Sequence, residues 1–265
     1  MISKIIHYCW FGKGLMPKSQ QDCIRSWKKI LPDYEIMRWD ESTFDYNAYS
    51  ASRYAYQEKK YALVSDVCRY NVLYEYGGIY LDTDVEVFRK FDEYLDAGFF
   101  SAIEMYNEFH TENSSALLDA NGNPLVQGTE IPHLEILTST MGSESGNLLI
   151  GELRDYYNNI EANEEYAINY RNYVNNDRLV AKYATTYGFR YVNEKQILAN
   201  NMVIYPTGIF GYKYCPDPAY SVTYHHNAAS WISKTRRKKF MYMLDQLHLL
   251  NSYKRLQAIK NKILK

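Results

Sequence analysis

The sequence predicts an α/β fold, and two observations lead to that prediction. The first ninety residues alternate short apolar runs with a helical period, in the order strand, helix, strand that is typical of a parallel sheet. The chain of 265 residues is 46% hydrophobic, which is enough for a substantial core. We predict one domain over residues 1–232, followed by a basic helical tail over residues 233–265.

The N-terminal elements can be justified in order. KIIHYCWFG, residues 4–12, is β-branched and aromatic and predicts a buried strand that ends in a glycine loop. SQQDCIRSWKKILPD, residues 19–33, has apolar residues at helical spacing and predicts a helix that stops at Pro32. YEIMRWD, residues 34–40, alternates and predicts a second strand.

The next two elements lead to a pair of carboxylates. Residues 61–76 repeat apolar positions with a 3.6-residue period, and Gly77 is a natural end for that helix. GIYLD then predicts a short strand with Asp82 at its carboxyl end, the edge where open α/β sheets bind ligands. Asp84 follows after one intervening residue, and two like charges at this spacing repel unless a cation or several donors lie between them.

The later part of the chain is less regular. Residues 104–130 are polar and rich in Asn and Gly, and predict a long loop or small insertion, such as a lid. NLLIGELRDYY, residues 147–157, predicts a helix, and VIYP, residues 203–206, predicts a short strand.

A second charged pair precedes the carboxylates. Asp66 and Arg69 are three residues apart and share one face of the helix over residues 61–76. A surface ion pair of little energetic value is the alternative. Their position directly before GGIYLDTD favours a functional site.

Three motifs, taken together, resemble a known family. KKYALVSDVCRYNVLYEYGGIYLDTDVEV strongly resembles the D-x-D region of family 32 glycosyltransferases of the bacterial capsule type. KIIHYCWFGKG is similar to the first strand of that family, and YHHNAASW, residues 224–231, to its closing motif. The resemblance covers residues 4–90 and roughly 203–232.

The resemblance implies a GT-A (Rossmann-like) nucleotide-sugar-binding fold, a nucleotide-sugar donor and a divalent cation, Mn²⁺ or Mg²⁺. A cation between carboxylates and a diphosphate would stabilise the charge of the leaving group. By analogy Asp84 is the direct metal ligand and Asp82 binds ribose or sugar hydroxyls. Asp66 and Arg69 would bind hydroxyls of the donor sugar.

The two flanking motifs supply further candidates. Trp10 matches the position where the family stacks an aromatic ring on the nucleotide base, which makes a UDP-hexose the default donor; a buried core tryptophan is the alternative. His226, chosen over His225, would complete the cation site. Ser230 and Trp231 would reach the diphosphate, and otherwise these residues form a polar strand end.

The resemblance also implies that the anomeric configuration is retained. Either a carboxylate nucleophile or same-face attack remains open, and Glu104 and Glu135 are available without being assigned that role. The segment over residues 137–147 loosely resembles a small-residue stretch that lies beside the donor sugar in relatives.

The net charge of −1 conceals a basic tail. Residues 233–265 contain ten Lys or Arg against the single Asp245, with an approximate apolar stripe. This pattern predicts an interfacial helix on an anionic membrane. Docking onto the catalytic core or a partner helix, or a solvated charge run, is the alternative, and nucleic acid is not expected as a partner.

The remaining composition bears on location. The four cysteines lack metal-type spacing, no secretory h-region opens the chain, and no apolar run is long enough to span a membrane. We therefore expect free thiols and a cytoplasmic protein. The resemblance to capsule-type enzymes implies a lipid-linked glycan as acceptor and, with the basic tail, a peripheral position on the inner face of the bacterial membrane.

The main hypothesis is a metal-dependent retaining glycosyltransferase for capsule or surface polysaccharide. One alternative is a non-catalytic protein that binds sugar nucleotides during assembly. The other is a phosphohydrolase, because the strand-end motif D-x-D-x-[T/V] of the haloacid-dehalogenase type resembles LDTDVE. Glu86 at the Thr or Val position and the late place of the motif in the chain disfavour the phosphohydrolase.

Overall fold

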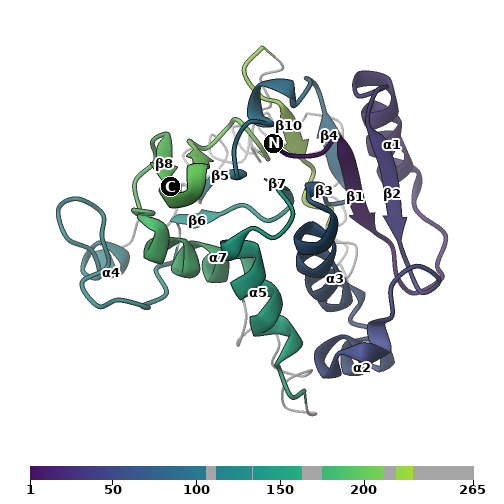
Figure 1. Cartoon of the computed structure of the whole chain (residues 1–265), viewed down its shortest axis with the longest axis horizontal. Coiled ribbons are helices and arrows are strands. Elements are labelled where there is room, and N and C mark those ends of the chain that lie inside the picture. The colour runs from purple at the N-terminus through teal and green to yellow at the C-terminus, as the bar shows by residue number, and fades with distance from the viewer. Residues whose placement is uncertain (106–111, 133, 163–174, 212–218, 229–265) are drawn as a thin grey trace, which may run out of the picture.

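The computed structural model has a mixed α/β fold around one large sheet (Figure 1). It describes the chain except for residues 106–111, 133, 163–174, 212–218 and 229–265. The strands are β1 (Ile5–Cys9), β2 (Glu35–Trp39), β3 (Gly78–Leu81), β4 (Val85–Val87), β5 (Phe99–Met105), β6 (Leu134–Ile136), β7 (Thr140–Ser143), β8 (Gln196–Leu198), β9 (Met202–Tyr205) and β10 (Thr223–His225). The α-helices are α1 (Lys18–Ile30), α2 (Ser50–Gln57), α3 (Tyr61–Tyr76), α4 (Glu112–Ser115), α5 (Leu148–Asn158) and α7 (Asn176–Ala184).

The N-terminal part of the sheet is parallel, as the sequence predicts. β1 lies between β2 and β3 and pairs in parallel with both, in a register that places Ile5 opposite Glu35 and Ile6 opposite Ile79. The helix α1 connects β1 to β2. Its apolar positions Cys23 and Trp27 repeat at helical spacing and are buried, which explains why this segment is helical. The predicted elements over the first ninety residues are therefore confirmed.

The rest of the sheet departs from the parallel expectation. The strand order is β2-β1-β3-β7-β5-β9-β8, with β6 paired to β5 outside this path. β7 is antiparallel to both β3 and β5, whereas β5 and β9 are parallel. Two short strands, β4 and β10, form a separate antiparallel pair.

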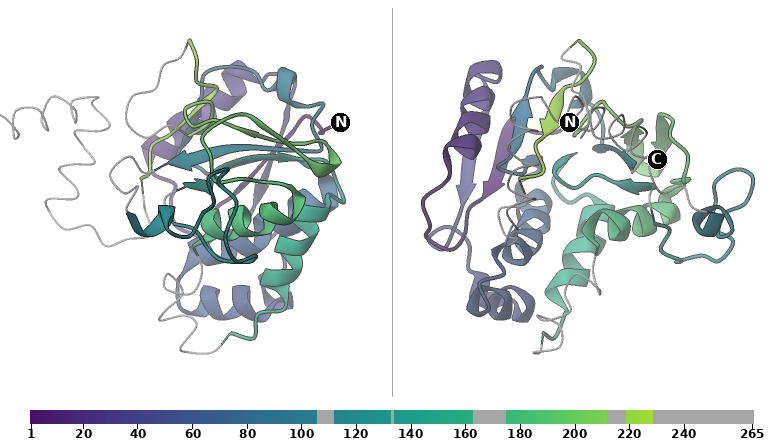
Figure 2. Two further views of the ribbon diagram at one scale, coloured as in Figure 1. Left: turned by 90° about the vertical axis from the view of Figure 1, so that its left-hand side faces the viewer. Right: turned by 180° about the vertical axis from the view of Figure 1, so that it is seen from behind.

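Both faces of the large sheet are covered, so its strands are apolar on both sides. Successive residues alternate between two buried clusters: Tyr80 belongs to one and Ile79 to the other, and Phe99 and Phe100 divide in the same way. Helices α3, α5 and α7 lie side by side against one face, and α1 lies on the opposite side (Figure 2).

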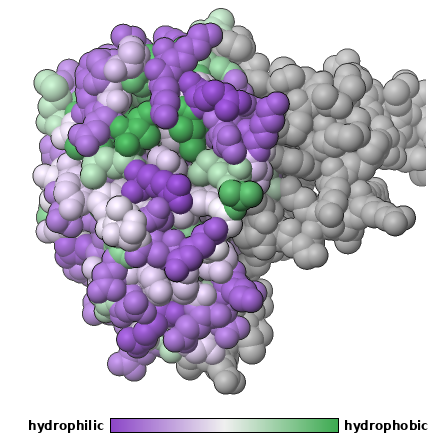
Figure 3. All heavy atoms as spheres, turned by 90° about the vertical axis from the view of Figure 1, so that its right-hand side faces the viewer, coloured by the Kyte–Doolittle hydropathy of each residue, from purple (hydrophilic) through white to green (hydrophobic). Residues whose placement is uncertain are grey.

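The edge strand β2 faces the outside beside α1. That side of the molecule is mostly hydrophilic, with an apolar area in its upper half (Figure 3). The partly buried Ile24 and Ile36 come from α1 and β2, while the charged Glu35 and Arg38 are exposed on the strand. Charged side chains on an edge strand oppose pairing with another chain.

The other predictions on organisation have mixed outcomes. Of residues 104–130, predicted as a loop or insertion, the first two end β5 and residues 112–115 form α4, whereas residues 116–130 contain turns and one isolated bridge. Cys9, Cys23 and Cys68 are buried free thiols. None of the described helices is long and apolar enough to cross a membrane. The basic tail over residues 233–265 lies outside the described residues and stays a prediction.

A glycine pair reverses the chain between α3 and β3 and so places Asp82. Gly77 and Gly78 have φ values of 63° and 100°, in the region that residues with a Cβ rarely adopt. A Cβ on Gly78 would lie 2.7 Å from the carbonyl oxygen of Ile5 in the neighbouring strand. Only glycine therefore fits this position without a shift of the backbone.

We expect Gly78→Ala to lower the free energy of unfolding by about 2 to 4 kcal/mol, since positive φ and a backbone clash add. Urea denaturation followed by circular dichroism measures this loss. The matched control is Gly14→Ala, where φ is not positive and nothing lies within 4 Å of the added Cβ. The control should change stability by less than about 0.5 kcal/mol. A similar loss in both variants would contradict the strain argument.

Candidate functional site

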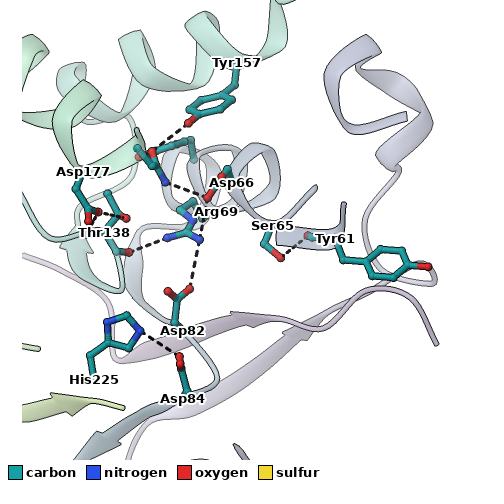
Figure 4. Close-up of polar contacts among 12 residues, drawn as sticks. Tyr61, Ser65, Asp66, Arg69, Asp82, Asp84, Thr138, Tyr157, Asp177 and His225 are labelled. Carbon is teal, nitrogen blue, oxygen red and sulfur yellow. Dashed lines mark hydrogen bonds and ion pairs between the residues drawn. The ribbon is translucent and has the colours of Figure 1, made fainter. Parts of the chain in front are cut away.

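Strand β10 brings a histidine to the carboxylates that follow β3. Asp82 directly follows the last residue of β3 and donates its backbone N–H to Ser139 O at 2.9 Å. The chain then enters β4, and the antiparallel pairing of β4 with β10 places His225 opposite Val85. As a result His225 Nε2 lies 3.2 Å from Asp84 Oδ1, and Figure 4 shows the pair below Asp82.

The charges of His225 and Asp84 depend on each other. Burial would raise the pKa of Asp84, but the nearby His225 and the N–H of Ala228, 2.6 Å from Oδ2, lower that pKa to about 2. Burial would likewise lower the pKa of His225, but the charge of Asp84 raises it to about 9. At neutral pH the structure therefore holds an imidazolium beside a carboxylate.

The donor set suits a cation. Asp82, Asp84 and His225 each offer one ligand atom, and these atoms all lie within 4.8 Å of one another. Carboxylate oxygens and one imidazole match Mn²⁺ well, whereas Mg²⁺ prefers oxygen ligands alone. The two carboxylates predicted to act together are thus adjacent in space.

The structure brings His225, and not the predicted His226, to the side chain of Asp84. His226, the predicted ligand, turns its Nε2 to Glu86 Oε2 at 3.0 Å. His225 is the histidine that faces Asp84. His226 directly follows the last residue of β10, and successive residues of an extended chain point to opposite sides, so only one of the pair faces the carboxylates.

Arg69 joins the predicted pair on α3 to the carboxylate after β3. Its Nη2 lies 3.0 Å from Asp66 Oδ1 and 3.3 Å from Asp82 Oδ1, and its guanidinium carbon lies 4.4 Å from the centre of the Tyr80 ring. Asp66 and Arg69 are buried, which rules out the surface ion pair that the sequence left open. Such a network compensates the buried charges, and removing one partner would leave the charge of the other uncompensated.

The first turn of α7 completes this network, and sequence reasoning missed it. Asn176 Nδ2 donates to Asp66 Oδ1 at 3.0 Å, and its own Oδ1 accepts from Tyr70 and Tyr157. The run NND before an apolar period signals only a helix start, and here Asn175 is indeed the N-cap. Nothing in this local signal indicates that the next side chain contacts Asp66.

Two buried carboxylates, Glu104 and Glu135, and one half-buried carboxylate, Asp177, also lie in this region. Glu104 and Glu135 are directly opposite in the β5–β6 pairing, and Glu135 accepts hydrogen bonds from Arg178. Asp177 accepts from Thr138, and burial, reinforced by the charge of Glu135, raises the pKa of Asp177 to about 6. The structure assigns neither Glu104 nor Glu135 a nucleophilic role.

The other predicted residues have different outcomes. Trp10 is half-buried after β1, and its Nε1 donates to Gly14 O at 2.8 Å. No contact in the described part of the chain joins Trp10 to the carboxylates, so its base-stacking role stays a prediction. Ser230 and Trp231 lie outside the described residues, and their role also stays a prediction.

The sequence around these residues matches the model of a protein family. Residues 17–100 match the family described as "Glycosyltransferase sugar-binding region containing DXD motif". The matched part of the chain includes Asp66, Arg69, Asp82 and Asp84. The predicted resemblance is confirmed at this broad level.

Two curated proteins are similar over parts of the chain. Inositol phosphoceramide mannosyltransferase 3 of Schizosaccharomyces pombe is 39% identical over 101 residues, which cover 36% of this chain and 27% of that protein. Subversion of eukaryotic traffic protein A of Legionella pneumophila is 25% identical over 155 residues, which cover 48% of this chain and 24% of that protein. The chain spans about a quarter of the length of these relatives.

Solved structures show distant similarity. The PaToxG glycosyltransferase is 17% identical, with a TM-score of 0.43, over 70% of this chain and 69% of that one. The galactosyltransferase LgtC, solved with donor and acceptor sugar analogues, is 13% identical, also with a TM-score of 0.43, over 92% of this chain and 95% of that one.

The charged pair of His225 and Asp84 predicts how stability depends on pH. Because folding raises the pKa of His225 from 6.5 to about 9, its contribution is complete below pH 6.5 and is lost as pH rises through 9. The free energy of unfolding, measured without metal by urea denaturation, should therefore fall between pH 7 and pH 10. His225→Gln should lose this part of the decrease.

The matched control is His226→Gln, which removes the neighbouring imidazole and leaves the pair of His225 and Asp84 intact. It should retain the wild-type slope of stability against pH. If His225→Gln and the wild type gave the same slope from pH 7 to 10, the pair would not be charged as described.

Proposed function

We propose that the chain is a metal-dependent retaining glycosyltransferase of GT-A type. It transfers a hexose from a nucleotide sugar, with UDP as the default nucleotide, to a lipid-linked oligosaccharide in bacterial capsule or surface polysaccharide synthesis. The proposal extends the broad DXD glycosyltransferase region to the more specific family 32. One observation supports it most strongly: the cation-type cluster of Asp82, Asp84 and His225 lies next to the buried network of Asp66 and Arg69.

The residues present fit a divalent cation. Two carboxylates from the turn after β3 and one imidazole from β10 lie close enough to share an ion. In the structure the positive charge beside Asp84 comes from the imidazolium of His225. A bound Mn²⁺ or Mg²⁺ would neutralise the charge that develops on a leaving diphosphate. Asp84 would be the direct ligand, and His225 would have to lose its proton to become one.

The remaining residues would hold the donor. Arg69 is fixed by stacking on Tyr80 and by its bonds to Asp66 and Asp82, so its orientation exists before any ligand binds. Such preorganised groups bind a substrate without the cost of ordering them. Arg69 Nε and Ser139 Oγ are buried without a hydrogen-bond partner among the described residues.

The identity of the donor rests on weaker support. Trp10 favours a pyrimidine base by analogy with relatives, which suggests UDP. The curated yeast relative is named a mannosyltransferase, and its similar segment, 39% identical, favours a GDP-mannose donor as a second possibility. An acceptor linked to lipid, and the docking of the basic tail on an anionic membrane at the cytoplasmic face, belong to the same proposal.

The first test is a thermal-shift titration with UDP, GDP and CDP, each with and without Mn²⁺. We expect one diphosphate to raise the melting temperature only with metal, since a ligand at 100 times its Kd stabilises the native state by about 2.7 kcal/mol. Asp84→Asn should abolish this metal-dependent shift and any transfer or hydrolysis of the sugar nucleotide.

The control is Asp155→Asn, which removes an exposed carboxylate on α5 and should behave as the wild type. Absence of any shift in the wild type at millimolar diphosphate would count against the glycosyltransferase and leave an assembly or phosphatase role. A full shift and full turnover in Asp84→Asn would refute the metal assignment alone.

A further inference from the structure

Arg69 depends for its position on a backbone carbonyl as well as on the two carboxylates. Its Nη1 donates to Thr138 O at 2.9 Å, on the opposite side of the guanidinium from the bonds to Asp66 and Asp82 (Figure 4). The next residue in that turn, Ser139, accepts the N–H of Asp82 through its own carbonyl. The turn before β7 thus holds both Arg69 and Asp82.

Asp177 on α7 fixes this turn. Its Oδ1 accepts the backbone N–H of Thr138 at 2.9 Å and also the Thr138 hydroxyl. A carboxylate in the first turn of a helix commonly serves the helix itself, by capping or by its interaction with the dipole. Here Asn175 already provides the cap, by accepting the N–H of Arg178, and the carboxylate of Asp177 is directed at Thr138.

The carboxylate at this position is energetically costly. Asp177 is half-buried, and its partial burial together with the charge of Glu135 raises its pKa to about 6. Thr138 is buried, so its hydroxyl and N–H need an acceptor. The carboxylate of Asp177 is costly to bury, yet it accepts two hydrogen bonds from the turn that contains Thr138. This arrangement suits a role in fixing that turn.

We propose that Asp177 is a positioning residue which, through Thr138, holds Arg69 against Asp66 and Asp82, and so sets the affinity for a sugar nucleotide relative to the nucleoside diphosphate alone. The proposal rests on the proposed function, in which Arg69 binds hydroxyls of the donor sugar. It deepens that function by assigning sugar discrimination to the junction of α7 with the turn over residues 137–139.

The hydrogen-bond chain makes three substitutions informative. Asp177→Leu keeps a similar volume and removes the acceptor, so Thr138 loses both bonds. Asp177→Asn keeps Oδ1 as an acceptor for both donors and removes only the charge. Thr138→Val keeps the backbone N–H bond and removes the hydroxyl, and so weakens the link by one bond.

The first readout needs no ligand. In ¹⁵N spectra of arginine side chains, a guanidinium held on both sides gives separate Nη signals, whereas a free one rotates and averages them. The Arg69 signals are assigned by their absence in Arg69→Lys. We expect them to be separate in the wild type and in Asp177→Asn, and averaged in Asp177→Leu.

The second readout is the ratio of affinities for a sugar nucleotide and its diphosphate, measured by calorimetry with Mn²⁺. The probes are UDP-glucose and UDP-galactose against UDP, and GDP-mannose against GDP. Loss of one well-placed bond to a charged group costs about 1.4 kcal/mol or tenfold, so Asp177→Leu should lower this ratio about tenfold. Thr138→Val should lower it by about threefold, and Asp177→Asn should keep it.

A role in overall stability alone would behave differently. It would lower the melting temperature of Asp177→Leu but leave the ratio and the Arg69 signals unchanged, and that result would overturn the proposal. In the Arg69→Lys background, Asp177→Leu should have no further effect on the ratio, because the two residues act in series. Equal effects in both backgrounds would also overturn it.

The failure of the proposed function can be told apart from the failure of this inference. If the wild type bound no nucleotide, but Asp177→Leu still averaged the Arg69 signals, the result would support the positioning role of Asp177 and refute the proposed donor site. If Asp177→Leu did not fold, Thr138→Val and Asp177→Asn would still decide the question, since each alters one bond or one charge.

Discussion

The candidate site depends on one buried guanidinium. Arg69 bonds to Asp66 on its own helix, to Asp82 at the end of β3 and to the carbonyl of Thr138 before β7. Two consecutive elements, α3 and β3, and the distant turn before β7 therefore meet at one charge. Because an uncompensated buried charge is strongly destabilising, the positions of α3, β3 and β7 are coupled to one another through this side chain.

A second constraint acts on the neighbouring carboxylate. The pairing of β10 with β4 is short, yet it fixes His225 beside Asp84, and the N–H of Ala228 also reaches that carboxylate. The chain thus compensates Asp84 with its own groups when no cation is bound. A cation that binds there competes with a proton, which links metal affinity to pH.

Much of the fold was accessible from local patterns. The order of β1, α1, β2, α3 and β3 follows from apolar period and from the glycine pair at residues 77–78, because these signals act over a few residues. The antiparallel insertion of β7 between β3 and β5 was not accessible. The strands β3, β5 and β7 pair through contacts between distant segments, and such contacts produce no periodic pattern in the sequence.

The sequence by itself determined which carboxylates lie at the sheet edge, and that Asp66 and Arg69 share a helix face three residues apart. The motif resemblance also agrees with the family whose model matches residues 17–100. Only the tertiary structure decided that His225 rather than His226 faces Asp84, because the side of a strand depends on its pairing register. It alone brought Asn176 and Asp177 to Asp66 and Thr138, because long-range packing places the first turn of α7 there.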